Sequence, residues 1–477
     1  MKSFRTEHDL LGEREIPSNA YYGVHTLRAL ENFPISGIAI NKHPVLVHAL
    51  ASVKQACAMA NHELGLLDTR RTEAIVQACK EIAAGSLHDH FVVDVIQGGA
   101  GTSSNMNANE VIANRALEIL GFELGNYQEL HPLEHVNLSQ STNDAYPTAL
   151  KLALNYEIEE LIKALDVLRL DFLKKAEEFA DVLKMGRTQM QDAVPMTLGQ
   201  EFAAYAGMIE KDQTRLKEVA LQIQLINLGA TAIGTGINCP AGYAELSSKH
   251  LSEITGINFV SAPDLVEATQ DTGPFVALSG ALKYTAVKLS KICNDLRLLS
   301  SGPRAGFNEI NLPAVQAGSS IMPGKVNPVI PEVVNQIAFE VIGNDVTVSF
   351  ASEGGQLELN AFEPIIIHNL LNSLSYLTKG SVILAERCVR GITANTERLN
   401  QIMESSIGIV TALNPYIGYE NSSSIAKEAF ATGKGVREIV LDRKLLTEEQ
   451  LDEILRPDLL TQPRVLKSSE TQNRANF

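Results

Sequence analysis

The stretch from Thr148 to Met185 restricts the fold more than any other part of the chain, because it contains neither glycine nor proline. It predicts one amphipathic helix about 55 Å long, at a rise of 1.5 Å per residue. Pro147 lies just before it, where a first helical turn accepts proline. The apolar positions recur every three or four residues, at Leu150, Leu154, Ile158, Leu161, Leu165, Leu168, Phe172, Ala176 and Phe179. An apolar face of this length needs partners that are equally long.

Four later stretches supply such partners. Helical spacing of apolar residues covers approximately 196–228, 274–301, 331–352 and 363–390. Five long helices predict a mainly α fold with a central helical bundle, because a βαβ fold would alternate helices with strands. Alanine and leucine are abundant in these helices, and apolar side chains occupy more than one face. We therefore expect bundles to pack on bundles in a homo-oligomer.

The chain divides on this basis into three predicted domains, at residues 1–142, 143–397 and 398–477. The first should hold short helices at 45–66 and 71–84, with the break between them and a cap for the second supplied by residues 66–69. The last should be a small helical domain in which Thr447 and Gln450 form a capping box. The polar tail at 468–473 is expected to fray.

Composition excludes several classes of function. The 477 residues carry a formal charge of −16, which disfavours nucleic acid or an anionic membrane as a partner. The five cysteines have no paired spacing for zinc or a redox motif, so they are expected to be reduced thiols. Neither a signal peptide nor a run of eighteen apolar residues is evident, which predicts a cytoplasmic protein.

The segment Gly318–Pro328 concentrates reactive groups in a loop. Its glycines and prolines prevent a regular helix or a central strand. It nevertheless holds two hydroxyls, an ammonium group and a side-chain amide, at Ser319, Ser320, Lys325 and Asn327. An ordinary surface loop has a similar composition, but the apolar residues within this segment argue against full solvation. We interpret it as a mobile functional loop.

Three further motifs place hydrogen-bonding groups where helices are expected to begin or end. A glycine-rich turn at 97–107 leads toward a helix at Ala108, and hydroxyl and amide groups at 135–144 precede the longest helix. The motif at 184–193 lies between the first two long helices. Each has a plain structural explanation, as a helix cap in the first two cases and as an αα-hairpin corner ended by Gly186 in the third. Together they suit a small dicarboxylate, which needs many donors and few competing acids.

The loop and the three motifs resemble those of the aspartase/fumarase superfamily, whose members eliminate across a Cα–Cβ bond to give fumarate. The resemblance extends from Phe4 to about Leu455, and within the superfamily it is strongest to the aspartases. It implies a three-domain lyase whose central five-helix bundle assembles into a homotetramer with shared active sites. It also implies reversible conversion of L-aspartate to fumarate and ammonia. No cofactor is implied, activation by a divalent metal is possible, and no motif identifies a metal site.

The resemblance assigns roles to individual residues. Ser319 corresponds to the base that removes a Cβ proton, which gives an aci-carboxylate intermediate. The carboxylate that receives this charge would be bound by Thr102, Ser141, Thr142 and Ser320. Lys325 and Asn327 correspond to the residues that hold the α-carboxylate. The amino group would be surrounded by Asn143, Thr188 and Gln189.

Two alternatives remain open. Fumarases typically have histidine where this chain has Gln189, and that histidine pairs with an acid at the position of Glu332. Glutamine cannot transfer a proton, so the sequence favours an aspartase over a fumarase, although some aspartases also have histidine there. The other alternative is a structural protein that has reused the fold. The presence of Ser319, Lys325 and Asn327 favours the enzyme.

Overall fold

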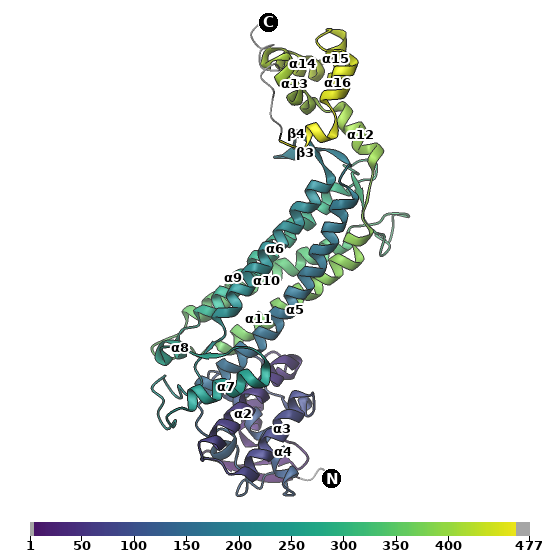
Figure 1. The fold of residues 1–477 in the computed structure, drawn as a ribbon. Coiled ribbons are helices and arrows are strands. Elements are labelled where there is room, and N and C mark those ends of the chain that lie inside the picture. Colours follow the sequence, from purple (N-terminus) through teal and green to yellow (C-terminus); the bar gives the residue numbers. More distant parts are fainter. Residues whose placement is uncertain (1–3, 464–477) are drawn as a thin grey trace. The chain divides into compact units, whose positions relative to one another are not determined.

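The computed structural model describes residues 4–463, which form two compact units. Unit 1 is drawn from residues 1–163, 212–287 and 337–378, and unit 2 from 164–211, 288–336 and 379–477. Both units are mainly helical. Each of the five longest helices contributes one part to each unit. They are labelled in Figure 1 and are α5 (Thr142–Glu178), α6 (Leu198–Gln222), α9 (Gly273–Leu299), α10 (Val329–Glu353) and α11 (Glu363–Arg387). The predicted five long helices are confirmed, but α5 begins at Thr142, six residues before its predicted start, so that Pro147 lies inside the helix and not just before it.

Packing between these helices follows the predicted apolar faces. The apolar residues of α5 from Leu150 to Phe172 are buried at their predicted spacing. In unit 2, Phe172 of α5 stacks against Phe202 and Tyr205 of α6, with ring centroids 5.9 and 5.6 Å apart. In unit 1, polar pairs add to the packing: Ser279 Oγ of α9 donates to Asp345 Oδ1 of α10 over 2.8 Å. Buried hydroxyl and carboxylate groups are thus satisfied between helices.

The segment after α5 differs from its prediction. The helix ends at Glu178, and the predicted αα-corner is a β-hairpin of β3 (Leu183–Thr188) and β4 (Gln191–Thr197). Gly186 lies in β3 at an irregularity of the register and does not end a helix. A Cβ at Gly186 would lie 2.9 Å from the carbonyl oxygen of Val194, so the two strands approach closely there. The helical period of the apolar residues continues into β3, which is why the pattern alone overran the end of the helix.

Unit 1 begins with an antiparallel hairpin of β1 (Phe4–Asp9) and β2 (Gly12–Pro17), which the sequence analysis did not predict. The helices α1 (Val24–Asn32), α2 (Pro44–Glu63), α3 (Thr69–Ala83) and α4 (Thr102–Ile119) follow. The two helices expected in this region are present, and the cap expected from residues 66–69 is Asp68, which accepts a hydrogen bond from the Arg71 backbone at the start of α3. Unit 1 also holds α7 (Tyr243–Thr255), α8 (Leu265–Gln270), and the short parallel pair β5 (Leu225–Ile226) and β6 (Val260–Ser261).

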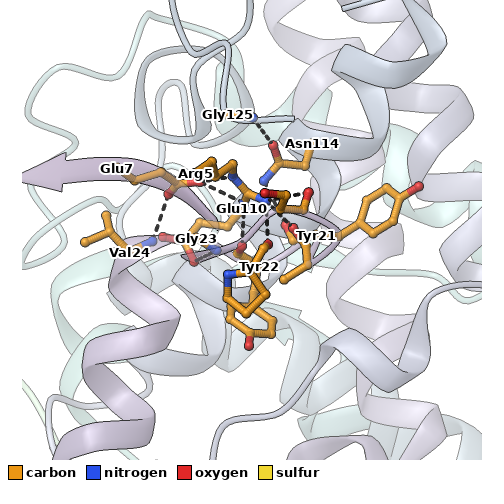
Figure 2. A network of polar contacts seen from close by, with 12 residues as sticks. Arg5, Glu7, Tyr21, Tyr22, Gly23, Val24, Glu110, Asn114 and Gly125 are labelled. Atoms are coloured by element: carbon orange, nitrogen blue, oxygen red, sulfur yellow. Dashed lines mark hydrogen bonds and ion pairs between the residues drawn. The ribbon is translucent and has the colours of Figure 1, made fainter. Parts of the chain in front are cut away.

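A buried carboxylate joins α4 to the N-terminus of α1 (Figure 2). Glu110 of α4 accepts hydrogen bonds from the backbone N–H groups of Gly23, His25 and Thr26, over 2.8, 2.8 and 3.1 Å. Glu7 of β1 accepts the neighbouring N–H of Val24 over 2.9 Å. The first N–H groups of a helix have no partner within it, so these carboxylates satisfy them and stabilise the helix dipole. They hold β1, α1 and α4 together.

The C-terminal part of unit 2 has a small apolar core of its own. Val410, Leu413, Ile425, Ile439 and Leu451 are among its buried residues. They come from the short helices α13 (Val410–Ile417), α14 (Tyr419–Thr432), α15 (Val436–Asp442) and α16 (Glu448–Ile454). In the chain, α12 (Thr396–Ser405) precedes these helices and α17 (Pro457–Leu460) follows them. The predicted capping box at α16 is confirmed, because Thr447 and Gln450 exchange both hydrogen bonds. The tail at 468–473 lies outside the described residues, and the three-domain division stays a prediction.

We expect replacement of Glu110 by alanine to lower the free energy of unfolding by about 3 kcal/mol, because three backbone donors lose their acceptor and a cavity forms. Chemical denaturation followed by circular dichroism measures the change. Glu118→Ala is the matched control on the same helix: Glu118 is exposed and pairs with Arg115 and Tyr21 at the surface, so its loss should cost less than about 1 kcal/mol. Equal effects of the two variants would contradict the capping role.

Candidate active site

The glycine-rich motif of unit 1 forms the N-terminus of α4. The helix begins at Thr102, earlier than the predicted start at Ala108. Gly101 has a φ of +88°, and a Cβ there would lie 2.2 Å from the ring of Tyr146 on α5. Only glycine fits this contact, which brings the start of α4 against α5. Thr102 is exposed, and its hydroxyl donates to the Gly99 carbonyl over 2.7 Å.

The start of α5 carries three of the predicted binding residues. Ser141 Oγ accepts the Asn143 N–H over 3.2 Å, and Asp144 Oδ1 accepts the Ser141 N–H over 3.0 Å. This reciprocal pair caps the helix, which is the plain structural role predicted for the motif at 135–144. The Asn143 side chain donates instead to the Ala232 carbonyl over 2.8 Å. Burial raises the pKa of Asp144 to about 7.

The two helix ends are joined by one hydrogen bond. Asn105, in the first turns of α4, donates from Nδ2 to the hydroxyl oxygen of Thr142 over 3.1 Å. The structure therefore brings Thr102 into the same region of unit 1 as Ser141, Thr142 and Asn143. Two helix N-termini with hydroxyl groups attract an anion through their backbone N–H groups and dipoles.

Thr188 and Gln189 are exposed at the tip of the β3–β4 hairpin in unit 2. Thr188 pairs with Gln191, which leaves Gln189 and Met190 as the two turn residues, with φ values of +51° and +65°. Two positive φ angles are typical of a type I′ hairpin turn, in which asparagine and glycine are the usual residues. Bulkier residues in this conformation are strained, and such strain is concentrated at functional sites.

The base of the hairpin is fixed by a buried ion cluster. Glu309 is fully buried, and its carboxylate lies 3.2 Å from Lys184 Nζ and 2.5 Å from an Arg187 nitrogen. Lys184 also pairs with Glu201 over 2.6 Å. A buried carboxylate is tolerated where charge partners surround it. Glu309 was not predicted from the sequence, because a single glutamate outside a motif gives no indication that it is buried or paired.

The predicted functional loop closes on itself at Gly318. The Gly318 N–H donates to the Lys325 carbonyl over 2.8 Å, and Asn327 Nδ2 donates to the Gly318 carbonyl over 2.7 Å. A Cβ on Gly318 would lie 2.6 Å from the Lys325 carbonyl oxygen, so a side chain would open this closure. Lys325 and Asn327 line a cavity of about 710 Å³ together with Arg297, Asn308 and Asn311.

The hydroxyl group of Ser319 faces two backbone donors. Its Oγ accepts the N–H of Met322 over 2.9 Å and the N–H of Ile321 over 3.2 Å. Ser319 is half-buried, whereas Ser320 and Lys325 are exposed. Two N–H groups aimed at one oxygen favour a negative charge on it, as in an oxyanion hole.

The predicted site residues thus form two sets within one chain. Thr102, Ser141, Thr142 and Asn143 belong to unit 1, and Thr188, Gln189, Ser319, Ser320, Lys325 and Asn327 belong to unit 2. His135, the first residue of the motif at 135–144, accepts the His131 N–H at Nδ1 over 2.7 Å. Within residues 4–463, no three His, Cys, Asp or Glu side chains group as a metal site would require. No helix in that range is long and apolar enough to cross a membrane.

The sequence also matches known families. A family model described as "Lyase" matches residues 12–343, and one described as "Fumarase C C-terminus" matches residues 409–462. An aspartate ammonia-lyase of Pseudomonas canavaninivorans is 58% identical over 97% of this chain and 98% of its own. The aspartate ammonia-lyase of Escherichia coli (strain K12) is 55% identical, over 97% of each chain.

Solved structures agree with these matches. A fumarate lyase:delta crystallin from Brucella melitensis bound to cobalt has a TM-score of 0.95 and 56% identity, with 97% of this chain and 100% of that one covered. A class II fumarase from Schistosoma mansoni has a TM-score of 0.90 at 36% identity, covering 95% and 98% of the two chains. On these identities and on the lyase model, the chain belongs to the aspartate ammonia-lyase family of carbon–nitrogen lyases.

Proposed function

We propose that this protein converts L-aspartate reversibly to fumarate and ammonia, with Ser319 as the base. The observation that carries the proposal is the pair of backbone N–H groups, from Ile321 and Met322, that face Ser319 Oγ. A serine hydroxyl is a poor base because its alkoxide is rarely populated. Donors fixed on the oxygen stabilise the alkoxide, and a closed, dry site would strengthen their effect.

In the proposed reaction, the Ser319 alkoxide takes a Cβ proton and the electron pair moves into the adjacent carboxylate. That group becomes an aci-carboxylate dianion. The pair then returns to form the Cα–Cβ double bond while the C–N bond of the substrate's ammonium group breaks, and the electrons of that bond leave with ammonia. Ser319 afterwards gives its proton to solvent. These steps use no organic or redox cofactor, and activation by a divalent metal, which the family resemblance allows, stays a prediction.

The binding roles divide by chemistry. Hydroxyl donors suit the carboxylate that gains charge, because their hydrogen bonds strengthen in the transition state; we assign this role to Thr102, Ser141, Thr142 and Ser320. Lys325 and Asn327 are assigned to the α-carboxylate as a cation and a planar donor. Asn143, Thr188 and Gln189 would surround the amino group.

We further propose that each active site is built by several subunits of a homotetramer. Ser141 directly precedes α5 and Thr188 lies in the hairpin beyond its end, and a helix of this length spans about 55 Å. Neighbouring subunits in antiparallel register could bring these residues to one substrate. The long helices leave apolar surface that such contacts would cover: on α10, Phe339 is 62% exposed and Phe350 is 72% exposed.

Replacement of Ser319 by alanine should lower turnover of L-aspartate by several orders of magnitude, because it removes the proposed base. Absorbance of fumarate measures the rate, and gel filtration checks the assembly. Ser405→Ala removes a hydroxyl from α12, where it donates to the Gln401 carbonyl, and should leave turnover unchanged. The role of Ser319 is refuted if the folded variant keeps more than about a tenth of wild-type turnover, a barrier change below about 1.4 kcal/mol.

Mixing the inactive variants Thr188→Ala and Ser319→Ala should recover activity when their subunits are allowed to exchange. In a mixed tetramer, some sites would receive an intact Thr188 from one chain and an intact Ser319 from another. Subunit exchange is verified with two differently tagged chains, and each variant reassociated alone is the control. Verified exchange without recovered activity would contradict a site shared in this way.

Deamination of L-aspartate should be faster than dehydration of L-malate by about 10² to 10⁴, because malate needs an acid to protonate its departing hydroxyl. Gln189 cannot serve as that acid. Fumarate is followed separately with each substrate. Equal rates would support the fumarase alternative, and failure of both substrates with an intact oligomer would support the structural-protein alternative.

A further inference from the structure

A lysine is buried behind the N-terminus of α5 without a direct carboxylate partner. Lys54 of α2 is 0% exposed, and its Nζ donates to Asn137 Oδ1 over 2.9 Å and to Gln140 Oε1 over 2.8 Å. Both partners are neutral amides. A buried ammonium group that donates only to neutral acceptors is costly. Burial lowers the pKa of Lys54 to about 8, while the Cys57 thiol and the Asp144 carboxylate act in the opposite direction. The presence of a lysine at this buried position therefore calls for an explanation other than packing.

The ammonium group fixes the orientation of the amides around it. Lys54 can only donate, so Asn137 must present its oxygen, and Asn137 Nδ2 then donates to the Gln140 carbonyl over 3.1 Å. The same Asn137 oxygen accepts Nδ2 of Asn105 and Nδ2 of Asn109, each over 3.1 Å. Reversing either amide would place two acceptor oxygens against each other. Lys54 thus determines that Asn105 presents its Nδ2 group, and not its oxygen, to Asn137.

The same order of donors and acceptors extends to Thr142, which is assigned above to substrate binding. The Nδ2 of Asn105 also donates to Thr142 Oγ1 over 3.1 Å. Because Thr142 accepts from Asn105, its own hydroxyl hydrogen remains available for an acceptor elsewhere, such as a carboxylate oxygen at the start of α5. If Asn105 presented its oxygen instead, it would accept that hydrogen.

We propose that Lys54 is a positioning residue of the dicarboxylate site. Through Asn137 and Asn105 it keeps Thr142 as a hydrogen-bond donor toward the substrate carboxylate, and its charge stabilises that carboxylate from within the protein. This inference rests on the proposed function, because it assigns Thr142 to the substrate. Charge in a buried site is weakly screened, so the stabilisation grows as the aci-carboxylate gains negative charge.

Three substitutions separate orientation from charge. Lys54→Arg keeps the donors and the charge, Lys54→Gln can keep a donor without the charge, and Lys54→Met keeps neither. Binding of succinate, a dicarboxylate that cannot be deaminated, is measured by calorimetry on the assembled protein. We expect affinity to fall in the order Arg, Gln, Met, with a loss of about tenfold or more for Met. Equal affinity of the wild type and Lys54→Met would overturn the proposal.

A second comparison tests whether Lys54 acts through Thr142, and it is available even if Lys54→Met does not fold. Lys54→Gln is combined with Thr142→Val, and the succinate affinities of the single and double variants form a cycle. We expect Lys54→Gln to weaken binding much less when Thr142 is already replaced. Additive losses would overturn the proposal, because a lysine that only supports the fold would act independently of Thr142.

Lys151 provides the matched control. It is also a buried lysine of unit 1, but its Nζ donates to the Leu225 carbonyl over 2.7 Å. Lys151→Gln should lower stability without changing succinate affinity relative to the wild type, and a loss of affinity equal to that of Lys54→Gln would overturn the specific role of Lys54.

Failure of the proposed function would be seen in a different measurement. A wild-type protein that binds succinate but releases no fumarate from L-aspartate would refute the activity, while the succinate affinities of the Lys54 variants could still be measured.

Discussion

The apolar face of α5 is the constraint on which the rest of the structure depends. A helix of 37 residues cannot bury its face within a small globular domain, so it requires four other long helices. Those helices fix where the connecting segments lie. Every group of predicted site residues is in a segment at a helix end: the turn before α4, the start of α5, the hairpin after α5 and the loop before α10. Rigid helices thus position the segments that carry the predicted site residues.

Helical periodicity was enough to predict the five long helices, because each buries one face over many turns. The same reasoning overran the end of α5, where buried residues of β3 such as Met185 continue the helical spacing. A short hairpin offers too few residues to establish a period of two, and its register depends on pairing with β4. The N-terminal hairpin was missed for a related reason, since much of β1 and β2 is exposed and polar.

For the candidate site, sequence motifs could identify residues but not the hydrogen bonds around them. Ser319 was predicted as the base from the family resemblance of its loop, whereas the two N–H groups on its oxygen arise from how the backbone turns at Ile321 and Met322. Lys54 could not be found from sequence, because a lysine within a helical pattern usually indicates an exposed position. Only its burial, and the amides that converge on it, distinguish it from other lysines.

The left-handed turn at the hairpin tip bears on how such a protein could change its substrate during evolution. Gln189 has a φ of +51°, a conformation in which histidine is found more readily than most residues with a side chain. An exchange of glutamine for histidine at this position would therefore leave the hairpin backbone as it is. The hairpin backbone accepts either side chain, so the position that we assign to the leaving group is free to diverge while the helical bundle is inherited unchanged.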